Sequence, residues 1–236
     1  MNGVFDLGGT DGLGAVNVVD DEPVFHADWE KHVFTMFPAC FRAGYFGVDS
    51  FRHGIEKMDP ATYLKAPYYE HWLHSIENHA IAAGAVDAAE LDRRTQHYLA
   101  NPDAPLPEHA QPRELVDFVE AVVPMGASAA RTIDRAPQFS VGDRARVSDS
   151  SPFGHTRRAR YVRGKTGAIV AHHGAFIYPD TAGNGLGEHP EHVYTIVFSS
   201  EDLWGADYAD PNASVCFDVW EPYLESAMTA GEGVRA

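Results

Sequence analysis

The sequence predicts an α+β protein, with a helical N-terminal part followed by a small, strongly bent antiparallel β-barrel or roll. Before residue 131, apolar residues recur at helical spacing in five segments, and several of these begin with a capping residue or a proline. After residue 131, short runs of alternating apolar and polar residues are separated by turns that contain glycine. Several short strands of this kind are typical of a small antiparallel barrel or roll.

The N-terminal part begins with a segment that has little periodicity. It is rich in glycine and aspartate, which predicts an extended arm (about residues 1–25). Asp49 is the expected N-cap of the second helix, Pro67 the first residue of the third, and Asp87 the start of a capping box in the fourth. Four prolines between residues 101 and 112 predict a stiff, exposed connector. The expected helices lie at residues 26–37, 48–58, 66–84, 87–99 and 112–123.

Strands are expected in the C-terminal part. They are predicted at residues 138–148, on both sides of a glycine-bounded turn within 161–178, at 191–204 and at 214–225. The expected domains are therefore a helical domain at 1–130, a β domain at 136–228 and a flexible tail at 229–236.

The composition limits the class of protein. The sequence has 18 Lys and Arg residues against 34 Asp and Glu residues, a formal net charge of −16, which repels phosphate at long range. No apolar run approaches the roughly 18 residues of a membrane span, and no signal peptide is recognised, so we expect a cytoplasmic protein that binds no membrane. The net charge also argues against nucleic acid as the main partner, unless a local basic face overrides it. The two cysteines, Cys40 and Cys216, lie far apart and form no CxxC motif, which indicates neither a zinc site nor a disulfide framework.

Positive charge is nevertheless concentrated in one region. Seven basic residues and a single acid, Asp149, lie between residues 144 and 165. Three interpretations are open: a nucleic-acid surface, exposed arginines that pair with acids elsewhere in the chain, or one or two arginines that hold a compact anion. The basic residues are Arg144, Arg146, Arg157, Arg158, Arg160, Arg163 and Lys165.

Two features of the helical part suggest a site. Arg52 falls in the first turn of a predicted helix, where the helix dipole disfavours a cation. Its side chain either points into solvent or is held beside Val48 and Phe51 by a specific anion. Tyr68 and Trp72 are spaced to share one helix face, which usually means core packing. No HExxH or GxSxG motif is present, so neither a metal site nor a serine hydrolase site is expected in this chain.

Motifs along nearly the whole chain resemble the β subunit of nitrile hydratase. The resemblance is carried by "MNGVFDLGGTDGLG", "FRHGIEKM", "YYEHWL", "GHTRRARYVRGKTG" and "HHGAFIYPDTAGNGLGEHPEHVYTIVF", among others. It implies an SH3-like β-roll after the helical part, and hydration of nitriles to amides. It also implies that an α subunit, not this chain, carries the metal, either cobalt(III) or iron(III), of which we favour cobalt. The expected assembly is an α–β heterodimer that doubles to an α2β2 heterotetramer.

The resemblance also implies roles for particular residues. Arg52 in "FRHGIE" and Arg157 in "GHTRRAR" match arginines that hydrogen-bond the oxidised cysteine ligands of the partner chain. His71 matches a helix position that joins a hydrogen-bond network near the site. The positions that match the substrate pocket are Phe37, Val48, Phe51, Tyr68 and Trp72. Ordinary core packing is the competing interpretation for these aromatic residues.

Two other functions stay open. A thiocyanate hydrolase subunit would share many motifs, although that enzyme divides the helical and β-roll parts between two chains. From a different class, a small-barrel RNA-binding protein would use the basic cluster at 144–165.

Overall fold

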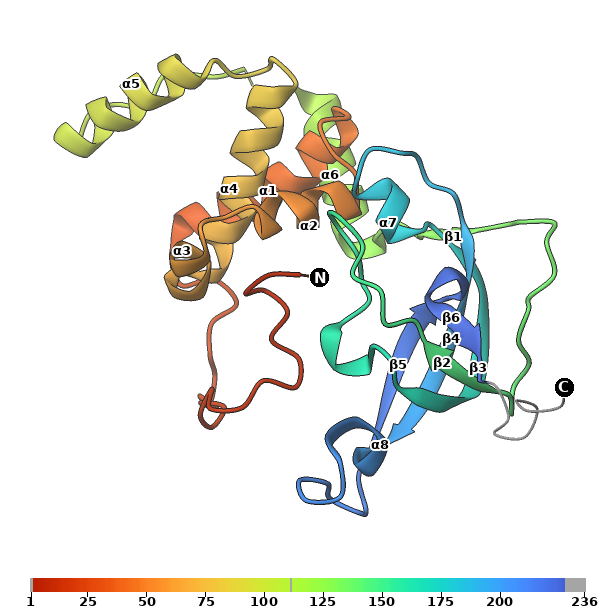
Figure 1. The fold of residues 1–236 in the computed structure, drawn as a ribbon. Coiled ribbons are helices and arrows are strands. Elements are labelled where there is room, and N and C mark those ends of the chain that lie inside the picture. Colours follow the sequence, from red (N-terminus) through yellow and green to blue (C-terminus); the bar gives the residue numbers. More distant parts are fainter. Residues whose placement is uncertain (1, 111, 228–236) are drawn as a thin grey trace, which may run out of the picture. The chain divides into compact units, whose positions relative to one another are not determined.

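The computed structural model describes residues 2–110 and 112–227, so the predicted flexible tail at 229–236 lies outside the described residues. The chain divides into two compact units (Figure 1). Residues 15–128 form a helical unit, and residues 1–14 together with 129–236 form a β unit. No helix among the described residues is long and apolar enough to cross a membrane.

The helical unit contains the five predicted helices and one that was not predicted. They are α1 (Asp28–Arg42), α2 (Val48–Glu56), α3 (Pro60–Lys65), α4 (Tyr68–Ala82), α5 (Ala88–Ala100) and α6 (Arg113–Met125). Helix α1 continues five residues past its predicted end at residue 37 and includes Pro38. The short α3 was missed, although Asp59 caps it by accepting a hydrogen bond from the Thr62 N–H at 2.9 Å. Residues 2–27 form no helix or strand.

The predicted helix starts are correct in one case of three. Asp87 is the N-cap of α5 and accepts the Glu90 N–H at 2.8 Å, as predicted. The prediction for Asp49 is wrong, because α2 begins two residues earlier with Gly47 as its N-cap. Pro67 is the N-cap of α4 rather than its first helical residue.

Aromatic side chains form much of the core of the helical unit. Tyr69 and Ile76 on α4 are buried against Val33 on α1 and Phe51 on α2. The buried Ser75 hydroxyl donates to the Phe51 carbonyl at 2.7 Å, which ties α4 directly to α2. Partly buried rings that pack around this cluster include Phe25, Phe34, Phe37, Tyr45 and Trp72.

The β unit contains an antiparallel sheet of six strands. The antiparallel arrangement agrees with the prediction, although the sequence indicated only four or five strands. The strand order is β5-β4-β3-β2-β6, and β1 pairs with β3. Its core includes Val147, Ile169, Tyr194 and Phe198. The strands are β1 (Ala130–Arg131), β2 (Arg144–Val147), β3 (Thr166–Phe176), β4 (Glu191–Ser199), β5 (Ser214–Trp220) and β6 (Leu224–Ser226).

Several predicted strands were too long. The strand predicted before the 164–165 turn is a 3₁₀ turn, η1 (Arg160–Val162), in which the Arg163 N–H bonds to the Arg160 carbonyl. Strand β4 stops at Ser199, whose side chain caps α8 (Ser200–Trp204). The strand predicted at 214–225 is interrupted by η2 (Glu221–Tyr223), where Pro222 cannot donate a ladder hydrogen bond. A further short helix, α7 (Pro179–Ala182), connects β3 to β4.

Candidate functional site

Arg52 lies in the first turns of α2 and pairs with an acid of its own helix. Its Nη1 donates to Asp49 Oδ1 at 2.9 Å, and its side chain is 46% exposed. The Asp49 carboxylate therefore offsets the unfavourable position of a cation near a helix N-terminus. Among the described residues, no other hydrogen bond or ion pair involves the Arg52 guanidinium.

Arg157 is fixed by its backbone rather than by its side chain. It lies in the loop of residues 154–158, and its N–H donates to the Tyr223 hydroxyl at 3.2 Å. The side chain is half-buried. No hydrogen bond or ion pair joins its guanidinium to any residue in the described ranges 2–110 and 112–227. Arg157 therefore has donors available for an anion from outside this chain.

The arginines around Arg157 are engaged within the β unit. Arg158 is 4% exposed, lies 5.1 Å above the Tyr223 ring and donates to Ser150 Oγ at 3.0 Å. The Arg160 N–H donates to Asp6 Oδ2 at 2.9 Å. Arg163 donates to the Asn2 and Ser151 side chains at 2.9 and 2.8 Å, and Arg146 pairs with Glu225 at 3.1 Å.

These contacts separate the three interpretations of the basic cluster. Pairing within the chain accounts for Arg146 and Arg160, and internal packing accounts for Arg158. A polynucleotide surface needs a continuous track of accessible cations, which this set of engaged arginines does not provide. Arg157 differs from these neighbours because its guanidinium has no such partner among the described residues.

No feature of the sequence indicated the residues that fix this loop. Tyr223, 1% exposed, accepts from Thr156 Oγ and the Arg157 N–H and donates to Asp180. Burial, and then the Asp180 carboxylate, raises the pKa of the Tyr223 hydroxyl, so it stays a donor at neutral pH. Asn184 holds the other side of the loop by bonding to the His155 backbone. No short-range spacing could reveal these contacts, since they join positions 29 to 67 residues apart.

The predicted pocket residues fall into two groups. Phe37, Phe51 and Trp72 pack on one another, with ring centroids 4.7 to 5.3 Å apart. Val48 and Tyr68 are instead 41% and 65% exposed. The structure thus brings three of the five together as part of an aromatic core and leaves two at the surface.

Tyr68 borders a groove in the helical unit. The groove has a volume of about 870 Å³ and is lined by residues from segments 22–30 and 67–70. The Tyr69 and Trp29 rings supply apolar wall, and Glu30 supplies a carboxylate that is almost fully buried. Such a mostly apolar groove with a few polar groups is suited to a small organic molecule.

His71 joins two helices. Its Nδ1 lies 3.0 Å from the Pro67 carbonyl oxygen and its Nε2 lies 2.8 Å from the Tyr63 carbonyl oxygen. The Tyr63 ring packs edge-on against the imidazole, with centroids 4.7 Å apart. His71 therefore links α3 to the start of α4, next to Tyr68.

The metal donors implied by the resemblance do not fit this chain. A thiolate site needs at least two cysteines together, and the chain has only Cys40, half-buried in α1, and Cys216, exposed on β5. The two belong to different units. Burial raises the pKa of the Cys40 thiol, which disfavours the thiolate that binds metal.

The fold is that of an α+β subunit in which Arg157 offers cationic donors and the two cysteines form no thiolate cluster. Sequence comparisons identify the family. The nitrile hydratase β-subunit N-terminal domain matches residues 1–116, and the C-terminal domain of the same subunit matches residues 128–226. The chain belongs to the nitrile hydratase β-subunit family, whose enzymes are hydro-lyases.

Two nitrile hydratase β subunits match the chain over nearly its full length. The chain is 61% identical over 236 residues to a nitrile hydratase subunit beta from Rhodococcus sp, covering 100% of both chains. It is 60% identical over 229 residues to a cobalt-containing nitrile hydratase subunit beta from Pseudonocardia thermophila, covering 97% of this chain and 98% of that one. A thiocyanate hydrolase subunit alpha from Thiobacillus thioparus is 38% identical over 96 residues, which is 38% of this chain and 72% of the relative. The resemblance stated from the motifs is confirmed.

Proposed function

We propose that this chain supplies the arginine donors and part of the substrate pocket of a cobalt-containing nitrile hydratase, whose metal is held by an α subunit. The observation that carries the proposal is the state of Arg157. The residue is half-buried and its backbone N–H is fixed, whereas its guanidinium has no partner among the described residues. Cobalt, rather than iron, is supported by the cobalt-containing relative that is 60% identical.

In this proposal the arginines recognise oxidised cysteine ligands of the α subunit. Sulfinate and sulfenate oxygens are costly to bury unless they accept hydrogen bonds. A guanidinium is permanently charged and presents its N–H groups in a planar fork, so it can hold two oxygens at once. The metal, when bound by the partner, acts as a Lewis acid. Arg52 and Arg157 would orient its ligands and so set the geometry around it.

The pocket assignments extend the proposal to the helical unit. In this proposal a small nitrile can contact the Tyr68 side chain directly, because Tyr68 is 65% exposed and borders the groove. Val48 is also exposed. The rings of Phe37, Phe51 and Trp72 would support the pocket as a rigid apolar layer, because they pack on one another. His71 would hold the α3–α4 junction in place beside Tyr68.

The proposed assembly is an α–β heterodimer that doubles to α2β2, in the cytoplasm. The family supports an α subunit as the partner. A reducing compartment is supported by the two unpaired cysteines, Cys40 and Cys216.

Conservative substitutions test the arginine roles. In the assembled complex, Arg52→Lys and Arg157→Lys keep the charge but lose the planar fork, and we expect kcat to fall about 10- to 100-fold. Arg113→Lys is the matched control, because the Arg113 side chain is 80% exposed and pairs with Asp117 of its own helix, α6. Size-exclusion chromatography and cobalt content establish that each complex is assembled and loaded. Unchanged kcat in both variants would exclude the proposed role.

A further inference from the structure

Asn184 lies just after α7, and its side chain bridges two segments that are distant in the sequence. Its Oδ1 accepts the His155 N–H at 3.0 Å, and its Nδ2 donates to the His155 carbonyl at 3.1 Å. The same Nδ2 donates to the Asp180 carbonyl at 2.7 Å. The amide thus holds the backbone of His155 from both sides, as a neighbouring strand would.

The approach of Asn184 to the loop is close enough to exclude a side chain at the preceding position. Gly154 has φ +76°, and a Cβ there would lie 2.9 Å from Asn184 Cγ and closer still to its Oδ1. Both the backbone conformation and the contact therefore require glycine. The backbone at Gly154 therefore packs directly on the Asn184 side chain, immediately before residues 155–158.

The other side of the loop is held through the Tyr223 hydroxyl. This group accepts from Thr156 Oγ and from the Arg157 N–H, each at 3.2 Å, and donates to the Asp180 carboxylate. Asp180 thereby connects the two supports, since its carbonyl accepts from Asn184 and its carboxylate accepts from Tyr223. The backbone is fixed at His155 and at Arg157, whereas the Arg157 guanidinium makes no bond to the described residues.

We infer that Asn184 is a positioning residue for Arg157: it clamps the backbone two residues upstream, so that the guanidinium is presented in one orientation to its anion. This role rests on the proposed function of Arg157. A side chain that must be held in one orientation depends on neighbouring residues that fix its position. Loss of such a neighbour typically lowers activity about 10- to 100-fold.

A double-mutant cycle in the assembled complex tests the inference. Asn184→Ala is expected to lower kcat about 10-fold, with a much smaller change in KM, because alignment rather than substrate binding is lost. In the Arg157→Ala background the same substitution should leave the residual kcat nearly unchanged. Asn101→Ala is the matched control, because Asn101 Nδ2 also donates to a backbone carbonyl, that of His97, but at the end of α5. We expect it to leave kcat unchanged.

A second variant and a second readout guard against simple misfolding. Asn184→Asp keeps the shape and the acceptor for the His155 N–H but loses both donated hydrogen bonds. Hydrogen exchange at the His155 and Arg157 amides should become faster in both Asn184 variants, while exchange in α4 is unaffected.

Each outcome is decisive. An equal loss of kcat in the wild-type and Arg157→Ala backgrounds would show that Asn184 does not act through Arg157. Unchanged kcat in both Asn184 variants, together with a low kcat in Arg157→Ala, would refute the clamp and leave the proposed function intact. An unchanged kcat in Arg157→Ala itself would refute the proposed role of Arg157, and the positioning role with it.

Discussion

At the scale of single residues, the N-terminal arm is attached to the β unit by a few specific contacts. Asp6 is 1% exposed and accepts the Arg160 N–H at 2.9 Å, and Arg160 Nη2 donates back to the Asp6 carbonyl at 3.0 Å. Gly9 passes against the Trp204 ring, which itself stacks on Tyr161 with centroids 5.5 Å apart. Residues 2–14 of the arm are therefore part of the β unit's packing, although they form no strand or helix.

A pair of alanine substitutions should separate packing from backbone strain in this arm. Gly9 and Gly12 both have positive φ, +69° and +80°, but a Cβ on Gly9 would lie 2.6 Å from the Trp204 ring, whereas one on Gly12 meets nothing within 4 Å. Gly12→Ala should lower the free energy of unfolding by about 1 kcal/mol, from backbone strain alone. Gly9→Ala should cost roughly 1–3 kcal/mol more, because the ring must move.

The readout for both variants is hydrogen exchange of the Arg160 amide, which bonds to Asp6 and is exposed if the arm detaches. We expect strong loss of protection in Gly9→Ala and little in Gly12→Ala. Equal protection in the two variants would mean that the Trp204 contact does not hold the arm.

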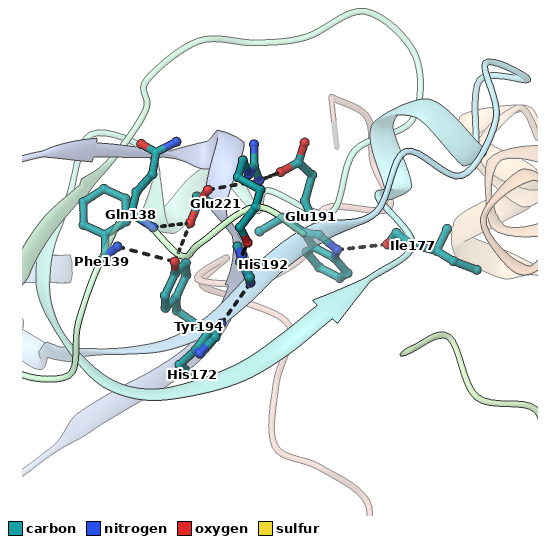
Figure 2. Close-up of polar contacts among 10 residues, drawn as sticks. Gln138, Phe139, His172, Ile177, Glu191, His192, Tyr194 and Glu221 are labelled. Atoms are coloured by element: carbon teal, nitrogen blue, oxygen red, sulfur yellow. Dashed lines mark hydrogen bonds and ion pairs between the residues drawn. The ribbon is translucent and has the colours of Figure 1, made fainter. Parts of the chain in front are cut away.

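At the scale of elements, the segment between β1 and β2 is attached to the sheet by a buried polar network (Figure 2). The Glu221 carboxylate, 3% exposed, accepts the Gln138 N–H at 2.9 Å and the Tyr194 hydroxyl, and pairs with Arg135 at 3.0 Å. His192 Nε2 lies 2.7 Å from the Arg135 carbonyl, and its Nδ1 lies 3.1 Å from His172 Nε2. Burial, and then His192, lowers the pKa of His172, which favours the neutral ring that this pair needs.

Substitution of Glu221 should loosen this segment selectively. Glu221→Gln keeps the shape and one acceptor oxygen, but it removes the charge that pairs with Arg135 and can place an amide nitrogen beside that guanidinium. We therefore expect a loss of about 2 kcal/mol in the free energy of unfolding. Glu191→Gln is the matched control. Glu191 also pairs with Arg135, but its side chain is 19% exposed and Arg135 keeps Glu221 when it is replaced, so the expected loss is below about 1 kcal/mol.

Urea unfolding gives both free energies, and exchange of the Gln138 amide shows whether the segment is the part that loosens. If the two variants lose the same free energy, Glu221 has no special role in anchoring the segment.

The elements also show what the sequence could predict. Helix periodicity is a local property, so five helices were found near their true positions, and the Asp87 cap was correct. The prediction of Asp49 as the N-cap was wrong because α2 already begins after Gly47. The Asp49 carboxylate accepts a hydrogen bond from Arg52 instead of capping the helix. Strand lengths were overestimated because β-like alternation continues through η1 and η2. In these segments, 3₁₀ hydrogen bonds between residues three positions apart replace the strand ladder. Glu221, within a predicted strand, gave no sign of being a buried acid.

At the scale of the whole molecule, the site is less predictable than the fold. Spacing identified an unusual Arg52 and a cluster of basic residues, but only the resemblance distinguished Arg157 from its neighbours. The structure adds a physical difference, since Arg158 is buried and Arg160 is paired whereas Arg157 has no side-chain partner among the described residues. The supports of Arg157 could not be predicted. Asn184 and Tyr223 are distant in the sequence and contact the backbone of residues 155–157 only in the folded chain.

The proposed division of the site, with arginine donors on this chain and the metal on an α subunit, leads to a prediction for the chain alone. Its two cysteines belong to different units, and no CxxC motif joins either of them to a second thiolate. We therefore expect the purified chain to retain no cobalt after dialysis and to show no nitrile hydration. Addition of a cobalt-loaded α subunit should produce turnover in proportion to the complex formed, measured by amide release and by size-exclusion chromatography.

The control is the α subunit alone at the same cobalt content. If the arginines of this chain complete the site, the α subunit alone should be far less active than the complex, and a complex that carries Arg157→Ala should fall between the two. Hydration by the purified chain without any partner would contradict the assignment of the metal to the α subunit. Full activity of the α subunit alone would instead show that the arginine donors are dispensable, because the metal ligands would then be held without them.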